Sequence, residues 1–145
     1  SQVAVQLAEP RILLYDHQVE IKNKIYTVDL IDTGVPHFVV QDLTFPFEES
    51  ARTLRYHPSA PHGANVNHFI GNRVRTYERG CEQETYACGT GIAACAYSRH
   101  TREKTPFPMT LFTVREKPLT IDLKEGRLWI EGEATFIFQG ELNLD

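Results

Sequence analysis

Apolar and polar residues alternate along much of this chain, a pattern typical of strands that bury one face. In the first 40 residues the alternation predicts strands at 3–7, at 11–15, on either side of Lys22-Asn23-Lys24, at 26–31 and at 38–40. Hairpin turns are expected at Asp16-His17 and at Lys22-Asn23. Pro36 and His37 then precede the strand at 38–40, so we expect His37 at a strand edge.

The second half of the chain continues the strand pattern, with sharp turns between the strands. Asn65 to Phe69 and Arg73 to Glu78 predict a hairpin about Gly71-Asn72, and Glu125-Gly126 predicts another turn. Further strands are predicted at 109–115, 119–123, 127–131 and 134–138.

Two segments depart from the alternation and are predicted as helices. In the segment from Glu48 to Tyr56, Phe47, Ala51 and Leu54 recur at helical spacing, which predicts a short amphipathic surface helix. The segment from Gly89 to His100 is apolar on all sides, as buried helices are. We therefore expect residues 1–145 to form one α+β domain, an antiparallel-rich mixed sheet wrapped around a central buried helix.

Charge and hydropathy narrow the class of protein. The 145 residues carry a formal net charge of -4. Arg73, Arg75 and Arg79 are the nearest approach to a basic cluster, and they fit better as outward charges along a strand, so nucleic acid is not the expected partner. No apolar run reaches the length of a membrane span, and a cytoplasmic protein is expected. The first residue is Ser1 rather than Met, so we expect that something upstream was removed or left out.

The three cysteines, Cys81, Cys88 and Cys95, cannot form a complete set of disulfides, and reduced thiols fit the cytoplasm. They are seven residues apart, whereas zinc thiolates usually lie roughly two to four apart, so no metal site is expected. Cys95 falls within the apolar helix and is expected in the core, and Cys81 falls in a loop.

Cys88 stands at the first turn of the predicted buried helix. Unpaired amides and the positive end of the helix dipole stabilise an anion there, so we expect a lowered thiol pKa. The amides of Gly89 and Thr90 could likewise hold a carboxylate. The alternative is that Cys88 is a small buried apolar residue and Gly89-Thr90-Gly91 only a tight turn.

The run around Cys88 carries a specific resemblance. Glu78-Arg79-Gly80, an acidic loop, Glu84-Thr85 and then Ala87-Cys88-Gly89-Thr90-Gly91 are similar to the second-half signature of diaminopimelate epimerases. Proline racemases look alike at Cys-Gly-Thr-Gly alone, and the preceding Glu-Arg-Gly makes the resemblance specific. Residues 3–10 and 126–141 also resemble the opening strand and closing hairpin of that family's second domain.

The resemblance implies a carboxy-terminal half of an enzyme with two similar domains and an active-site cleft between them. Each half supplies one cysteine, so the missing amino-terminal half would be the partner of this chain. One thiolate removes the α-proton of an amino acid and the opposite thiol protonates the other face, with neither pyridoxal phosphate nor metal. The family interconverts LL- and meso-diaminopimelate for lysine and peptidoglycan precursors. A homodimer is left open.

Roles for individual residues follow from the same resemblance. Cys88 would be the acid/base, and Gly89 and Thr90 would bind the α-carboxylate. Glu78 and His37 match positions near the thiols and the substrate amino group, where they tune protonation.

Asn65 and Arg79 match positions that bind the distal end of the substrate, for which the planar Arg fork suits a carboxylate. Asn65 could instead be a turn residue.

Val35 departs from the family pattern, because many members have a substrate-binding Asn there. A racemase for glutamate or another small amino acid is therefore an alternative to a diaminopimelate epimerase. A ligand-binding domain of the same fold without catalysis is the other, and an upstream reading frame with a second cysteine motif would argue against it.

Overall fold

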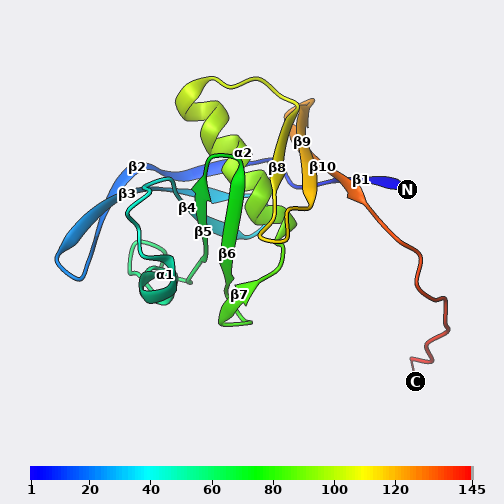
Figure 1. Cartoon of the computed structure of the whole chain (residues 1–145), viewed down its shortest axis with the longest axis horizontal. Helices are drawn as coiled ribbons and strands as arrows, with labels where there is room; N and C mark the ends of the chain where they lie inside the picture. The colour runs from blue at the N-terminus through cyan, green and yellow to red at the C-terminus, as the bar shows by residue number, and fades with distance from the viewer. Residues whose placement is uncertain (145) are drawn as a thin grey trace.

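The computed structural model describes residues 1–144, and in that range a ten-stranded sheet and two helices account for the regular structure (Figure 1). In chain order the elements are β1 (Gln2–Gln6), β2 (Arg11–Ile21), β3 (Lys24–Asp32), β4 (Pro36–Val40), α1 (Phe47–Arg55), β5 (Asn65–Ile70), β6 (Arg73–Glu78), β7 (Gln83–Thr85), α2 (Gly89–Glu103), β8 (Met109–Phe112), β9 (Pro118–Lys124) and β10 (Arg127–Glu133).

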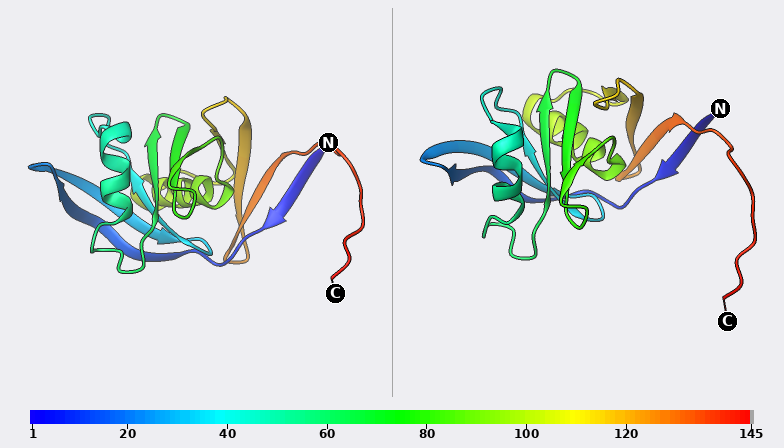
Figure 2. Two further views of the ribbon diagram at one scale, coloured as in Figure 1. Left: turned by 90° about the horizontal axis from the view of Figure 1, so that it is seen from below. Right: turned by 60° about the horizontal axis from the view of Figure 1, so that its bottom comes forward.

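The sheet is mixed and curves around α2. Its order is β1-β10-β9-β8-β6-β5-β4-β3-β2, with β7 paired to β6. Only β4–β5 and β6–β8 pair in parallel, and the other neighbours are antiparallel. Figure 2 shows α2 held within the curve of the sheet. The predicted α+β class, with an antiparallel-rich sheet around a central helix, is confirmed.

Helix α2 forms the centre of one of two apolar clusters. Ile92, Ala93, Ala94, Cys95 and Ala96 are all 1% exposed or less and pack against side chains from β3 to β6 and β8 to β10. Small side chains let the strands approach the helix closely, which fits the apolar segment seen in the sequence. The core position expected for Cys95 is therefore confirmed.

Helix α1 covers the second apolar cluster with the face that the sequence predicted. Phe47, Ala51 and Leu54 are buried there against β2, β3, β4 and β5. Glu48 and Glu49 lie in its first turn and Arg52 and Arg55 in its last, which is the charge order that the helix dipole favours.

One of the two turns predicted in the first hairpin was wrong. Asp16-His17 is not a turn, because β2 runs through it with a shift of register on each side of Leu14. Asp16 has a φ of 54° and its N–H donates to Asp29 Oδ1 at 2.9 Å. The polar pair thus marks a bulge bound by a tertiary contact, whereas Lys22-Asn23 is the turn that was expected.

The end of the chain departs from the prediction as well. No strand follows β10 within residues 1–144, although 134–138 alternate. The other edge of β10 is already paired with β1, and Phe136, Ile137 and Phe138 are about four-fifths exposed. Alternation without a partner strand makes no ladder.

Two smaller differences concern the end of one strand and the presence of another. β8 stops at Phe112 rather than Arg115, because Glu116 N–H returns to the Thr113 carbonyl in a tight turn. The short strand β7, in a segment expected to be a loop, leads directly to the start of α2.

Candidate functional site

Cys88 is the residue that caps the amino-terminal end of α2. Its backbone is extended, with φ -134° and ψ 104°, and its side chain is partly exposed. No carbonyl within residues 1–144 accepts from the N–H groups of Gly89, Thr90 and Gly91, and the first intrahelical bond runs from Ile92 N–H to the Cys88 carbonyl. The first turn has no acidic residue. A thiol and three amides therefore share the positive end of one helix.

The thiol does not have the lowered pKa that we expected from the helix terminus. Burial raises the pKa of Cys88, and the nearby Glu78 carboxylate raises it further. The Thr90 hydroxyl and the backbone N–H groups of Gly91 and Thr90 act in the opposite direction. Desolvation of the thiolate is the larger effect, so the resting side chain is a neutral thiol surrounded by donors that favour its ionised form.

Thr90 is held from β4 and from the loop between β3 and β4. Its carbonyl accepts a hydrogen bond of 2.8 Å from the Thr33 hydroxyl, and its hydroxyl lies 2.8 Å from His37 Nε2. The same hydroxyl lies 3.5 Å from Cys88 Sγ. Thr90 thus connects the thiol to the sheet.

His37 is not at a strand edge, and that prediction was wrong. It lies within β4, between β3 and β5, and is 0% exposed. Burial lowers its pKa from 6.5 to about 3, with Arg79 adding to the decrease and Asp32 opposing it. The ring is therefore neutral near pH 7 and approaches Cys88 through Thr90.

Asn65 and Arg79 also lie together beside His37. Asn65 is on β5, where its amide donates to the Pro36 carbonyl at 3.2 Å and accepts from Arg79 N–H at 2.8 Å. The alternative of a turn residue was wrong. The Arg79 side chain bonds the His62 carbonyl at 3.0 Å through Nη1, which leaves donors of the fork for another acceptor.

Glu78 ends β6 and also lies near the thiol. It accepts a hydrogen bond from Thr85 of β7, and its charge acts on Cys88. The seven predicted site residues, His37, Asn65, Glu78, Arg79, Cys88, Gly89 and Thr90, thus come together at one end of α2. They come from β4, β5, the end of β6 and the residue after it, the loop after β7 and the first turn of α2 itself.

Two buried polar residues of this cluster were not predicted, Thr33 and Asn67. Asn67 is 0% exposed and lies 2.9 Å from His37 Nδ1. The spacing of Asn65 and Asn67 was the available signal, since residues two apart on a strand share one face.

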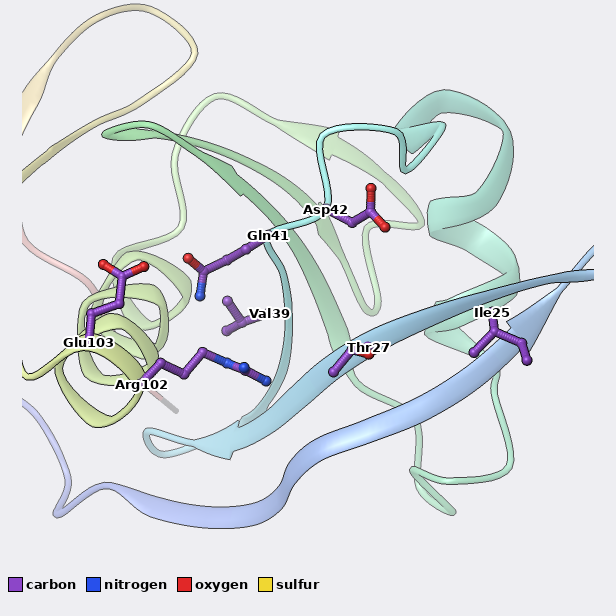
Figure 3. A pocket seen from close by; sticks show the side chains of 7 residues that line it. All are labelled: Ile25, Thr27, Val39, Gln41, Asp42, Arg102 and Glu103. Carbon is purple, nitrogen blue, oxygen red and sulfur yellow. The ribbon is translucent and has the colours of Figure 1, made fainter.

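A groove of about 520 Å³ lies elsewhere, beside the carboxy-terminal half of α2 (Figure 3). It is lined by Ile25, Thr27, Val39, Gln41, Asp42, Arg102 and Glu103. Arg102 reaches from α2 toward the sheet and is bound to Asp29. The groove is separate from the cysteine cluster and contains none of the predicted site residues.

Within residues 1–144 no group of three or more His, Cys, Asp or Glu side chains is placed to hold a metal ion, and no helix there is long and apolar enough to cross a membrane.

Curated relatives match the chain along most of its length. It is 36% identical to the diaminopimelate epimerase of Hydrogenobaculum sp. over 162 aligned positions, covering 100% of this chain and 57% of that protein. The diaminopimelate epimerase of Aquifex aeolicus is 36% identical over 98% of this chain and 55% of its own length. The chain thus spans about half the length of these relatives. No protein-family profile matches it.

Solved structures share the fold. A hydroxyproline epimerase from Agrobacterium vitis superposes with a TM-score of 0.66 at 18% identity, over 90% of this chain and 49% of its own. A probable proline racemase from Agrobacterium radiobacter gives a TM-score of 0.68 at 14% identity, over 99% and 54%. At these identities the likeness concerns the fold, and again about half of each longer protein.

Proposed function

Since the chain belongs to the diaminopimelate epimerase family and spans about half the length of the relatives it matches, we propose that it is the carboxy-terminal half of an amino-acid epimerase. A companion half would contribute the opposite wall of the cleft and a second thiol. The relatives' reaction, diaminopimelate epimerisation, is the proposed activity of the two halves together.

The observation that carries this proposal is the arrangement at the start of α2. The Cys88 thiol and the N–H groups of Gly89 and Thr90 lie at the same helix end, with no acidic residue in the first turn. An α-carboxylate bound to those amides would bring its α-carbon beside Sγ.

The proposed chemistry needs one proton acceptor and one donor. A thiolate on one face takes the α-proton, so the C–H bond breaks and its electron pair spreads onto the carboxylate. A thiol on the other face then gives its proton to the α-carbon, and the configuration is inverted with no net change in oxidation state. The amides of Gly89 and Thr90 would stabilise the developing charge on the carboxylate oxygens. Cys88 would serve as thiolate in one direction and as thiol in the other.

Neighbouring residues fit supporting roles. The Glu78 carboxylate raises the pKa of Cys88 and would accept hydrogen bonds from the substrate ammonium group. His37 would act on the thiol through Thr90. Asn65 and the free part of the Arg79 fork would bind the distal end of the substrate.

The substrate is proposed to be diaminopimelate, with glutamate as the alternative that Val35 leaves open. Val35 presents no polar group to a distal amino-acid moiety, and the shorter side chain of glutamate would require fewer contacts there. The proposed product, meso-diaminopimelate, would serve lysine and peptidoglycan precursor synthesis.

The test uses the complete protein, with the companion half present. Exchange of the α-hydrogen with solvent deuterium is followed by NMR for LL-diaminopimelate and for glutamate at equal concentrations. We expect exchange and epimerisation of diaminopimelate, with glutamate much slower. Equal or faster turnover of glutamate would overturn the assignment of the substrate, and exchange of neither would favour a non-catalytic binding domain.

The 145-residue chain alone supplies the matched control. It lacks the opposing acid/base, so we expect no epimerisation from it. Measurable exchange by this chain alone would contradict the two-half mechanism.

A further inference from the structure

We propose that Asn67 is a positioning residue, which fixes the tautomer of His37 so that the Thr90 hydroxyl donates its proton to the sulfur of Cys88. The inference rests on the proposed role of Cys88 as acid/base. It concerns four side chains that are linked in order from the interior of the sheet to the thiol.

The orientation of the Asn67 amide follows from its partners. Its Nδ2 lies 2.9 Å from the Phe38 carbonyl, which can only accept, and its Oδ1 accepts from the Thr76 hydroxyl at 2.8 Å. A flipped amide would place two acceptors against each other at Phe38. The nitrogen of Asn67 therefore faces both Phe38 and His37.

That orientation decides where the proton of His37 lies. The same Nδ2 lies 2.9 Å from His37 Nδ1, so Nδ1 must be the acceptor. A neutral imidazole has one N–H, which is then on Nε2 and donates to Thr90 Oγ1 at 2.8 Å. Asn65 Nδ2 also faces Nε2, but it lies 3.5 Å away and donates to the Pro36 carbonyl, so the shorter contact from Asn67 decides the tautomer. Because the Thr90 hydroxyl already accepts this proton, its own is free for Cys88 Sγ at 3.5 Å. Every donor in the series points toward the sulfur.

The charges around the series agree with this assignment. Asp32 and Arg79 face His37 with opposite effects, and burial lowers the pKa of the ring to about 3, so His37 stays neutral. Around the thiol, burial and Glu78 raise the pKa of Cys88, and Thr90 is the foremost group that lowers it. The buried Cys95 is close enough to be affected by the charge of Cys88. The donor from Thr90 thus favours formation of the thiolate against the effect of burial.

The packing of α2 supports a fixed geometry. A Cβ built on Gly91 would lie 2.3 Å from Asn67 Oδ1 and 3.1 Å from His37 Cε1. The first turn of the helix therefore rests directly on these two side chains, which holds Thr90 in register with His37. Only glycine allows this approach.

The tautomer can be read directly by NMR. In protein labelled with ¹⁵N-histidine, the His37 ring is assigned as the signal lost in His37→Gln. We expect a neutral ring protonated at Nε2, unchanged from pH 7 to pH 5. A ring protonated at Nδ1, or an imidazolium, would overturn the proposal.

The effect on the thiol is measured by the pH dependence of alkylation with iodoacetamide. A Cys81→Ser background removes the exposed thiol, and the pH at which the rate rises reports the ionisation of Cys88. Thr90→Val should slow alkylation at pH 7 about tenfold, since one hydrogen bond to an anion is lost. Thr90→Ser keeps the hydroxyl and should restore the rate. An unchanged profile in Thr90→Val would contradict the series.

Asn67→Leu tests the positioning residue itself. It removes the donor to Nδ1, so both tautomers become available, and alkylation should slow in the same direction as in Thr90→Val. Thr76→Val removes a bond to the same amide without changing which atom faces His37, and should leave the profile unchanged. A folded Asn67→Leu protein with the alkylation profile of the parent would refute the positioning role. If that variant does not fold, the His37 tautomer seen by NMR and the comparison of Thr90→Val with Thr90→Ser decide whether the proposal holds.

These readouts do not depend on turnover. A protein with the expected tautomer and thiol profile that fails to epimerise diaminopimelate would refute the proposed function alone. An active epimerase with His37 protonated at Nδ1 would refute the positioning role alone.

Discussion

The two ends of α2 differ in whether their polar groups have hydrogen-bond partners. At the carboxy-terminal end, Asp29 is 1% exposed and is bound on both oxygens. It accepts from Ser98 at 2.6 Å, from Arg102 Nε and Nη2 at 2.7 Å each, and from Asp16 N–H at 2.9 Å. Hydrogen bonding to Asp29 raises the pKa of Arg102 further above its usual value. Positive charge in the last turn also suits the helix dipole.

At the amino-terminal end, the corresponding groups are left open. The first-turn amides of Gly89, Thr90 and Gly91 have no carbonyl acceptor within residues 1–144, and those of Thr90 and Gly91 face the Cys88 thiol. Polar side chains gather around Cys88, yet they hold the thiol rather than neutralise the helix end. The carboxy-terminal end thus contributes to stability, whereas the amino-terminal end keeps N–H groups without a carbonyl acceptor at some cost in stability.

Replacing Cys88 should give the largest effect, a loss of rate with little change in stability. In the complete protein, Cys88→Ser should lower the rate of epimerisation by roughly 10²–10⁴-fold, because a serine hydroxyl is a far weaker acid/base near neutral pH. Stability should change by less than about 1 kcal/mol, since the side chain is only partly buried. Rates come from the deuterium-exchange assay and stability from urea unfolding.

Cys95→Ala is the matched control on the same helix. Cys95 is 0% exposed, so its truncation should cost about 1–2 kcal/mol of stability and leave the rate nearly unchanged. If Cys88→Ser kept its activity, Cys88 would be a structural residue.

Replacing Asp29 tests the carboxy-terminal end of α2, where the polar groups are fully paired. Asp29→Ala should lower the free energy of unfolding by about 2–4 kcal/mol, because Arg102 and Ser98 lose a buried partner, although part of Arg102 remains hydrated. Urea unfolding measures the change.

Glu103→Ala is the control at that helix end. Glu103 is 59% exposed and lies 3.9 Å from Arg99, so the expected change is within about 0.5 kcal/mol. A similar loss in both variants would show that the buried pair adds nothing beyond surface charge.

The contrast between the ends also shows what a sequence can predict. The alternation along 26–31 and 65–78 and the apolar run in α2 are local patterns, and they predicted the sheet and its central helix. The Cys-Gly-Thr-Gly run likewise located the thiol at a helix start. Each feature is set by residues near one another in the chain.

The missed features depend on residues far apart. His37 is buried because β5 pairs alongside β4 in parallel, with Asn65 opposite it, a register that tertiary packing decides. Asp29 and Arg102 are 73 residues apart, and no local pattern joins them. The sign of the shift in the Cys88 pKa was wrong because the helix terminus is visible in sequence and the burial of the thiol is not.

Adding a methyl group at Gly91 would disturb the packing at the amino-terminal end of α2 without changing the Cys88 thiol. A Cβ there would lie 2.3 Å from Asn67 Oδ1, and that amide is held by three bonds, so we expect Gly91→Ala to cost about 1–3 kcal/mol. Gly132→Ala is the control, because its Cβ would meet only the end of the Leu119 side chain at 2.4 Å, which can turn away. Thermal unfolding of both variants gives the comparison, and equal losses would mean that the Asn67 contact is not rigid.

The pH dependence of stability gives the smallest effect and tests the neutral ring. His37 has a pKa of about 3 in the fold against an ordinary 6.5, so between these values the unfolded chain binds a proton that the folded chain does not. Stability is therefore complete above pH 6.5 and decreases as the pH falls toward 3. Between pH 7 and pH 5.5 His37 should account for a loss of about 1 kcal/mol, which His37→Gln would remove. Urea unfolding of both proteins at each pH measures this difference, and parallel curves would show that His37 is protonated in the fold and that the open end of α2 carries a charge.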